Sequence, residues 1–370
     1  MNTGNVTTGA VTVAPVSKIT VPLTIQQVTG ATGANFINIV NSSGTGIGGI
    51  NANLCAYGAW AGDICSGRLT LSSTDPCPTA DYSGITTLYY LPYKGRGMVT
   101  LWNPAGFWET LPLPSAGISR SIVGFGANTL CDFFVYNNNG TLALTQVAWT
   151  SMGAGTSARQ SGYALSHIGD YWYPNTSPQS WEGFGSFTPQ ANRYVGTILT
   201  TGAGGATTDS TISRGVWNMH NQAMRPIWVE EAAYYPLSTS STSYVFQWSN
   251  NSVSNCCAYI ANGNPTGTWP IRIAWETFIE MDHPPSAGKI GRMMALNTLP
   301  SSVTFNSNTL PYLCDTLQQV TLTSGYTTLQ APSGYNFISL VDVLIYYTQG
   351  TYSTQSCGVW YSTIMGGVMA

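Results

Sequence analysis

The stretch from Cys131 to Trp149, CDFFVYNNNGTLALTQVAW, restricts the possible folds more than any other part of the sequence. Two apolar runs flank Asn139-Gly140, and both of these residues tolerate the positive φ angles of a type I′ turn. The stretch therefore predicts a β-hairpin. Its register is Tyr136 opposite Ala143, Val135 opposite Leu144, Phe134 opposite Thr145 and Phe133 opposite Gln146.

Both faces of this hairpin are apolar. One face carries Cys131, Phe133, Val135, Leu142 and Leu144. The other carries Phe134, Tyr136, Val147 and Trp149. A hairpin with one solvated face would alternate apolar with polar residues. We therefore expect the second face to be covered by a second sheet or by a neighbouring copy of the chain.

Charged residues are rare in this chain. They make up 7% of the 370 residues, with a formal net charge of −3, whereas about 25% charged residues is usual. Charged side chains normally keep monomers apart and protect exposed strand edges. The composition therefore predicts an oligomer, and the lack of basic clusters argues against nucleic-acid binding.

The N-terminal stretch from Met1 to Lys18 has no basic segment followed by a continuous apolar segment, so no signal peptide is predicted. No apolar run approaches the ~20 residues of a membrane span. We therefore expect neither an export signal nor a membrane-spanning segment.

Turn signals divide the chain into three regions. Residues 1–64 are rich in Gly, Thr and Asn, and we expect an extended arm that mediates assembly or attachment. Residues 65–228 contain many short β-prone runs, which predicts a β-sandwich. Residues 229–370 predict a second, jelly-roll-like β-sandwich. The predicted fold class is thus all-β, with β-sandwich or jelly-roll-like domains and an extended N-terminal arm.

One segment favours a short helix. In SRGVWNMHNQAMR, Ser213 is a candidate N-cap, and Pro226 follows directly after the last residue, Arg225. These signals predict one or two helical turns.

Several motifs occur in an order that resembles a known family. They are GITTLYYLPYKGRGMVTLWNPAGFWETL, CDFFVYNNNGTLALTQVAWT, RYVGTILTT, Trp217-Asn218 ahead of Arg225-Pro226, and the strand beginning at Gly334-Tyr335. They resemble the β domain of virion structural proteins of tailed bacteriophages and related viruses. The insertion at about residues 169–189 is longer than in that family.

The resemblance implies a structural component of a virus particle, assembled in the host cytoplasm and located in the virion. The implied types are a fibre, a capsid-decoration protein or a tail-associated protein. Such a protein is expected to be a homo-oligomer, with a trimer favoured, and to contact other virion proteins through the N-terminal arm. It is expected to be neither an enzyme nor dependent on a cofactor.

The alternative hypothesis is a spike that binds or cleaves host surface glycans, because aromatic faces stack on sugars. The candidate carbohydrate or subunit contacts are Tyr171, Trp172, Tyr173, Trp181 and Phe184.

Glycan cleavage would need a carboxylate pair. Glu276 and Glu280 share one face of a predicted strand with Arg272. We interpret that face as polar surface opposite Ile271, Ile273, Trp275 and Ile279.

No catalytic or metal-binding set is predicted. The three histidines, His167, His220 and His283, are far apart, and none has cysteine or carboxylate neighbours at ligand spacing. The eight cysteines contain no C-x-x-C pair, and we expect reduced, buried thiols without disulfides.

Overall fold

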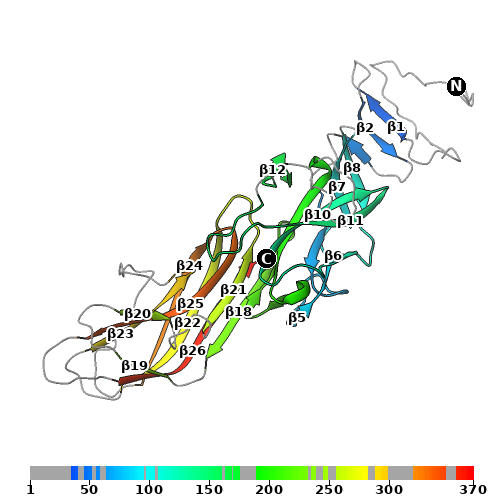
Figure 1. The fold of residues 1–370 in the computed structure, drawn as a ribbon. Helices are drawn as coiled ribbons and strands as arrows, with labels where there is room; N and C mark the ends of the chain where they lie inside the picture. The colour runs from blue at the N-terminus through cyan, green and yellow to red at the C-terminus, as the bar shows by residue number, and fades with distance from the viewer. Residues whose placement is uncertain are drawn as a thin grey trace, which may run out of the picture.

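The computed structural model describes most of the chain. The described residues are 35–40, 46–51, 56–58, 64–95, 97–104, 107–160, 163–168, 170–175, 189–231, 235–238, 245–248, 256–281, 288–298, 320–346 and 356–370. These residues form β-strands and two short 3-10 turns, Pro189–Ala191 and Ala203–Gly205. The predicted all-β sandwich class is confirmed (Figure 1).

A central sheet of eleven strands runs through the molecule. Its main path is β11 (Thr141–Ala148), β10 (Thr129–Asn138), β14 (Asn192–Thr200), β15 (Thr207–Ser210), β16 (Ser213–Arg214), β21 (Cys257–Asn262), β25 (Gly334–Tyr346) and β20 (Val245–Trp248). Three further strands join it at the side, namely β5 (Tyr82–Ile85), β17 (Val216–Asn218) and β23 (Gly288–Leu296).

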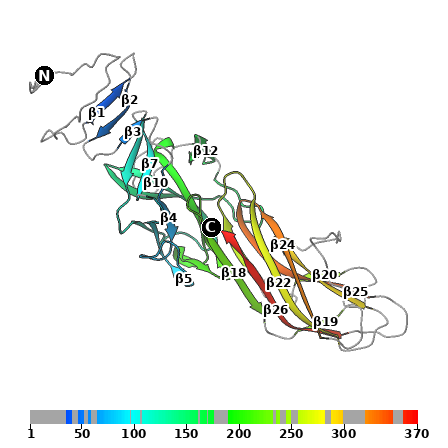
Figure 2. The same cartoon turned by 180° about the vertical axis from the view of Figure 1, so that it is seen from behind.

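An outer sheet of five strands lies over the second half of the central sheet (Figure 2). Its path is β18 (Met224–Glu231), β26 (Ser356–Met369), β22 (Trp269–Met281) and β24 (Val320–Ala331), and β19 (Tyr235–Ser238) pairs with β26. The pairs between its described strands are antiparallel.

Smaller sheets complete the fold. The N-terminal sheet contains β1 (Asn35–Val40), β2 (Gly46–Asn51), β3 (Ala56–Gly58), β8 (Phe107–Pro112) and β7 (Met98–Asn103). A three-stranded sheet contains β4 (Gly67–Thr70), β6 (Thr87–Pro92) and β9 (Ile118–Ser121). A separate pair joins β12 (Leu165–Ile168) to β13 (Tyr171–Pro174).

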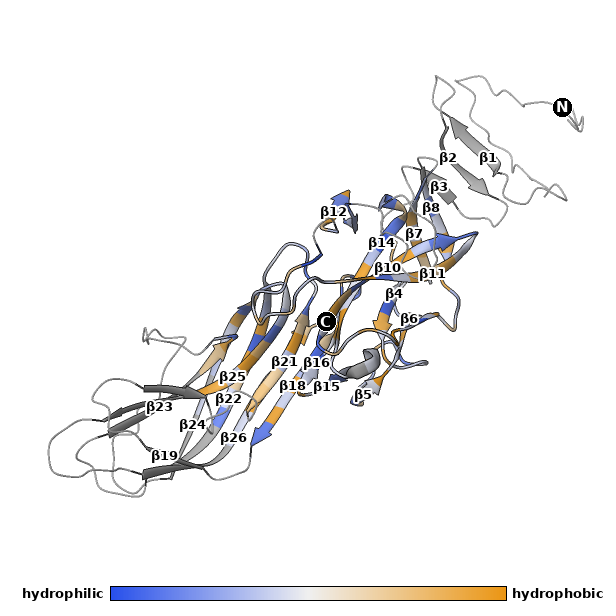
Figure 3. Ribbon diagram, viewed as in Figure 1, coloured by the Kyte–Doolittle hydropathy of each residue, from blue (hydrophilic) through white to orange (hydrophobic). Residues whose placement is uncertain are grey.

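Two apolar cores lie on opposite faces of the central sheet. The first core joins β10, β11 and β14 to the N-terminal and three-stranded sheets. The second joins β10, β21 and β25 to the outer sheet, and Figure 3 shows the apolar character of β21 and β25. This three-layer order explains why strands of the central sheet are apolar on both faces.

The predicted hairpin is confirmed in its register. Tyr136 pairs with Ala143, and the three following pairs agree as well. Asn139 and Gly140 have φ angles of 53° and 90°, as a type I′ turn requires.

The hairpin's second face is covered from within the chain. Phe134 and Val147 belong to the second core, together with Trp217 and Ile227. Phe133 and the other residues of the first face belong to the first core. The sequence left two possible covers for this face, a second sheet or a neighbouring copy of the chain. At Phe134 the cover is the second sheet.

The predicted helix between Ser213 and Arg225 is wrong. That segment forms β16, β17 and the start of β18, with bends between them. Buried and exposed residues alternate on β18, as they do in a strand with one buried face. Arg225, Ile227 and Val229 point inward, and the intervening residues are exposed. Pro226 is tolerated because β18 lies at the end of the outer sheet's path, and proline is found on edge strands.

The boundary proposed at residue 228 falls inside β18, which pairs along its length with β26. The central sheet also contains strands from both sides of that position. In the proposed arm, the described strands form the β1–β2–β3 ribbon, and Tyr57 of β3 pairs with Glu109 of β8. The arm run from Ile19 to Ile25 lies outside the described residues.

Within the described residues, no helix has the length and apolar character needed to cross a bilayer.

Candidate functional site

The first of the predicted aromatic contact residues, Tyr171, lies inside the protein. It is 2% exposed. Its hydroxyl donates to the backbone carbonyl of Gln190 over 2.7 Å and accepts from the backbone N–H of Trp102 over 3.4 Å. Its ring packs edge-on against Trp108, with 4.9 Å between ring centroids. Burial raises the pKa of the Tyr171 hydroxyl. Tyr171 is therefore a core residue with a satisfied hydroxyl and has no face free for a sugar.

The next two aromatic residues on β13 are only half-buried. The ring of Trp172 lies 4.6 Å from that of His167, and Trp172 packs at the margin of the second core. The ring of Tyr173 lies 6.2 Å from that of Tyr171. Trp181 and Phe184 lie outside the described residues. Of the five predicted contacts, Trp172 and Tyr173 are thus the ones seen with partly open rings.

A buried ion pair lies at the middle of β10. Nε of Arg159 donates to Oδ2 of Asp132 over 2.6 Å, and the hydroxyl of Thr197 donates to Oδ1 over 2.6 Å. Nη2 of Arg159 also donates to the carbonyl of Gly263 over 2.8 Å, and the Tyr194 hydroxyl donates to the same carbonyl over 2.7 Å. This network, the Asp132 lock, joins the hairpin to β14, to the segment after the hairpin and to the turn after β21.

The environment of the Asp132 lock shifts two pKa values. Burial lowers the pKa of Arg159, but the carboxylate of Asp132 and the hydroxyl of Tyr194 together outweigh it, and the net shift is upward. Burial, with the negative charge of Asp132, raises the pKa of the Tyr194 hydroxyl. Arg159 therefore stays charged and Tyr194 stays neutral, which suits a permanent cross-link.

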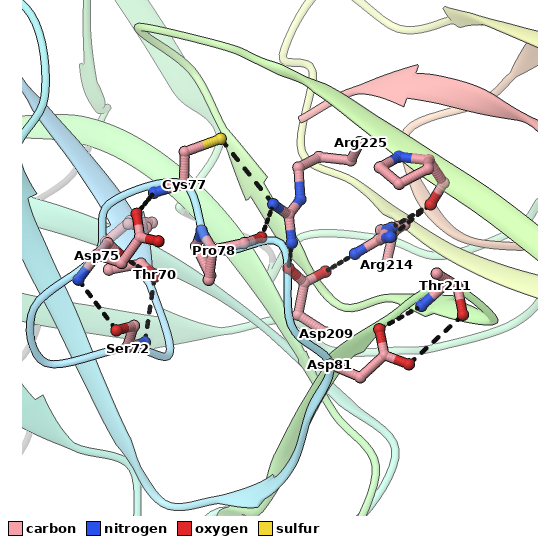
Figure 4. Close-up of polar contacts among 12 residues, drawn as sticks. Thr70, Ser72, Asp75, Cys77, Pro78, Asp81, Asp209, Thr211, Arg214 and Arg225 are labelled. Atoms are coloured by element: carbon pink, nitrogen blue, oxygen red, sulfur yellow. Dashed lines mark hydrogen bonds and ion pairs between the residues drawn. The ribbon is translucent and has the colours of Figure 1, made fainter.

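A second buried network lies where the 71–81 loop meets β15, β16 and β18 (Figure 4). Nη2 of Arg225 is 2.9 Å from Oδ2 of Asp209, and Nη1 of Arg214 is 3.6 Å from Oδ1. Arg225 also donates to the carbonyl of Pro78, and Nε of Arg214 donates to the carbonyl of Pro226 over 2.8 Å. We call this network the Asp209 lock.

A third arginine lies beside the Asp209 lock. Nε of Arg68 donates to the carbonyl of Pro76 over 2.9 Å, and its Nη1 donates to that of Asn221 over 2.9 Å. Burial lowers the pKa of Arg68 and raises the pKa of Asp209, although Arg214 and Arg225 oppose the latter shift. The guanidinium groups of Arg68 and Arg225 bind backbone carbonyls of loops, and that of Arg214 binds a carbonyl of β18, so this cluster also serves to fasten the chain.

Neither lock was predicted from the sequence. The signal for the first was available, because Asp132 is the one charged residue between Cys131 and Trp149. A charged residue within an otherwise apolar strand is rarely buried without a partner. Its partners could not be named, since Arg159 and Thr197 lie far along the chain.

The described histidines do not come together. His167 is exposed on β12. His220 has its Nε2 out of contact with solvent, and burial together with the positive charge of Arg193 lowers the pKa of His220 to about 3. His283 lies outside the described residues. In the part of the chain that is described, no three His, Cys, Asp or Glu side chains are placed to hold a metal ion.

Five cysteines whose side chains are described are not in disulfides, namely Cys65, Cys77, Cys131, Cys256 and Cys257. Of these, Cys65, Cys131, Cys256 and Cys257 are buried. Burial raises the pKa of the Cys257 thiol to about 12, which makes it unreactive.

The outward face of the outer sheet carries the carboxylate considered for glycan cleavage. On β22, Ile271, Ile273 and Trp275 point into the second core, and Arg272 and Glu276 lie on the opposite face. The side chain of Glu280 lies outside the described residues. The expected division of this strand into an apolar and a polar face is thus confirmed as far as Glu276.

An apolar row crosses the same outward face. The register places Trp228 of β18 opposite Met365 of β26, Met365 opposite Ala274 of β22, and Ala274 opposite Tyr326 of β24. Trp228 is 46% exposed and Tyr326 is 84% exposed. We call these four residues the apolar row. Apolar residues scattered singly on a surface are ordinary, but a contiguous set suggests a contact.

No protein-family model matches the sequence, and no curated protein matches it either. Among solved structures, the chain is similar to one in the structure of infectious bursal disease virus Gx strain, with 11% identity and a TM-score of 0.28 over 88% of this chain and 74% of that one. A chain in the structure of the Gt strain has 10% sequence identity and a TM-score of 0.26, and the match covers 78% of this chain and 72% of that one. A chain in the crystal structure of the VP2 subviral particle of the same virus has 10% sequence identity and a TM-score of 0.26, and the match covers 67% of this chain and 73% of that one. These TM-scores are too low to carry an argument about this chain.

Proposed function

We propose that this protein is a non-catalytic structural subunit of a virus particle, such as a fibre, a capsid-decoration protein or a tail-associated protein, and acts by oligomeric assembly. The observation that carries the proposal is that the buried charged side chains of the two locks pair with one another and with backbone carbonyls. Asp132, Arg159, Asp209, Arg214 and Arg225 fasten strands and loops to one another. Cross-links of this kind yield a rigid body, which is what a particle subunit needs.

The surface of the described residues supports the same proposal. Large apolar side chains that are exposed include Val123, Ile212, Met224, Trp228 and Tyr326. Only 7% of the whole sequence is charged. A protein with few surface charges and several exposed apolar residues is poorly protected against association. Assembly with copies or other virion proteins would cover such residues.

The attachment role of the N-terminal region is part of the proposal. The β1–β2–β3 ribbon extends the N-terminal sheet beyond β8 and lies at one end of the molecule (Figure 1). A ribbon at the end of a sheet can accept or donate a strand to a partner. This region is therefore suited to contacts with other virion proteins.

The proposal is tested by locating the protein on particles. We expect antibodies against the purified protein to label virus particles in electron microscopy, and mass spectrometry to find the chain among washed particle proteins. A variant lacking residues 2–60 should still melt cooperatively but should no longer join particles. Particles that contain none of the chain would contradict a virion role.

The glycan-binding alternative rests on Trp172, whose half-buried ring lies at a tilt beside that of His167. If this pair holds a sugar, binding to an immobilised glycan set should be lost in Trp172→Ala and kept in Trp102→Phe. Equal binding by both variants would remove Trp172 as the contact. We favour the structural role because Tyr171, the first residue of the predicted cluster, is buried.

A further inference from the structure

The apolar row is bordered by charges of opposite sign. Arg272 and Glu276 lie two residues before and two residues after Ala274 on β22, on the same outward face. Successive residues on one face of a strand are separated by about 7 Å. The row therefore runs between a positive position on one side and a negative position on the other.

This arrangement complements itself under a two-fold rotation. Consider two copies stacked face to face, with the two-fold axis running along the apolar row between them. The rotation reverses the strand direction and leaves each strand opposite its own copy. Ala274 then faces Ala274 of the second copy, and Arg272 of each copy faces Glu276 of the other. The charges of Arg272 and Glu276 are thus both paired, and the apolar row is covered.

Turning the axis to run along the strands would lose this pairing. Arg272 would then lie opposite the β26 position of the same register, Gly367, and Glu276 opposite Thr363. The charge pattern thus selects the first arrangement, and such contacts between identical surfaces are the commonest kind in symmetric oligomers.

We propose that the outward face of the outer sheet is a contact surface for a second copy of this chain, stacked antiparallel about the apolar row. The residues that carry it are Trp228, Ala274, Tyr326, Arg272 and Glu276. The sheets would lie about 10 Å apart, as in face-to-face β packing. The inference goes beyond the proposed function, because this pairing would occur in solution without any particle.

The described neighbours of the row fit a protein partner. Met224 and Met369 are exposed at one border, and Met224 is 57% exposed. Methionine side chains adapt their shape and are common at protein contact surfaces. Flexible apolar side chains of this kind favour a protein surface over a sugar, which is held by flat rings and polar groups.

A charge-swap experiment tests the pairing. Arg272→Glu would place two carboxylates opposite each other at both ends of the contact, and Glu276→Arg would place two guanidinium groups there. We expect each single variant to associate roughly tenfold or more weakly than the unchanged protein. Sedimentation velocity over a concentration series measures this. Lys94→Glu, an exposed charge change outside the outer sheet, should leave the association unchanged.

Mixing the two single variants supplies the decisive result. In a mixed pair, each of the two positions again has opposite charges facing each other. The mixture should therefore associate more tightly than either single variant alone, and the double variant Arg272→Glu/Glu276→Arg should also dimerise about as tightly as the unchanged protein. Circular dichroism and melting curves should show that every variant is folded.

Three outcomes would overturn the inference. The first is an unchanged protein that stays monomeric up to high micromolar concentrations. The second is a mixture of folded single variants that associates no better than its components. The third is a Trp228→Ala variant that sediments unchanged but loses binding to a glycan, which would identify the face as a sugar platform.

Discussion

Arg159 reaches from the segment after the hairpin to Asp132 in the middle of β10, and the two side chains are 15% and 4% exposed. Removing one partner from a buried pair leaves the other charge without compensation, at a cost of about 3–5 kcal/mol.

We therefore expect Asp132→Asn to lower the free energy of unfolding by about 2–5 kcal/mol, with the lower limit set by hydrogen bonds that the amide retains. Urea unfolding followed by tryptophan fluorescence measures this. Asp170→Asn, at an exposed position, should change the value by less than about 0.5 kcal/mol. Equal, small effects of the two substitutions would show that the Asp132 lock does not stabilise the fold.

The second prediction concerns the two faces of β10. Phe133 is buried in the first core and Phe134 in the second, both within one chain. Phe133→Ala and Phe134→Ala should each cost about 3–5 kcal/mol. Neither cost should depend on protein concentration. If only the cost of Phe134→Ala grew as the protein was concentrated, a neighbouring copy would be covering that face.

The third prediction concerns the hairpin turn. Gly140 has a φ of 90°, which side chains with a Cβ rarely adopt, and an added Cβ would meet no atom within 4 Å. Gly140→Ala should therefore cost about 1–2 kcal/mol through backbone strain alone. Gly126→Ala is the matched control, since its Cβ would make only an ordinary contact of 3.5 Å with Thr129. Melting temperatures that fall equally for both variants would refute the turn.

The fourth prediction is a pH dependence from His220. Its pKa is lowered to about 3 in the folded protein, from an ordinary value of 6.5. Between these values the unfolded chain binds the proton and the folded protein does not. The stability is therefore fully present above about pH 6.5 and is lost as the pH falls, by at most about 1.4 kcal/mol per pH unit.

The measurement is urea unfolding at several pH values between 7 and about 4. His220→Gln should flatten the decline, while His167→Gln at the exposed position on β12 should not. Asp209 acts in the opposite direction, because its pKa is raised and its protonation at low pH favours the folded state. An identical pH profile for His220→Gln and the unchanged protein would contradict the assignment.

The hairpin from Cys131 to Trp149 could be predicted to the residue, because its pairing is local and Asn139-Gly140 specifies the turn. The helix expected from Ser213 is wrong because the alternation of inward and outward residues on β18 overrides the local capping signals. Local signals are overridden when distant strands offer a better-buried arrangement.

Most of the candidate site could not be predicted. Tyr171 was named as a contact, but its burial depends on Trp108 and Arg193, which reach it only through the tertiary fold. The apolar row combines Trp228, Ala274, Tyr326 and Met365 from four strands, and their alignment follows from the register of three strand pairs. A sequence shows which residues alternate along one strand, but not which strand lies next to it.

The position of β26 has a consequence for how the chain acquires its structure. β26 lies between β18 and β22, and its Met369 pairs with Met224 of β18. The edge strand β18 and its neighbour β26 are therefore far apart in the sequence. Joining such distant segments slows folding, because a long loop must close before the contact forms. During synthesis on the ribosome, β18 would emerge long before β26 and would wait with Ile227 and Val229 uncovered. We expect the outer sheet to be the last part of the protein to fold and the part that chaperones protect.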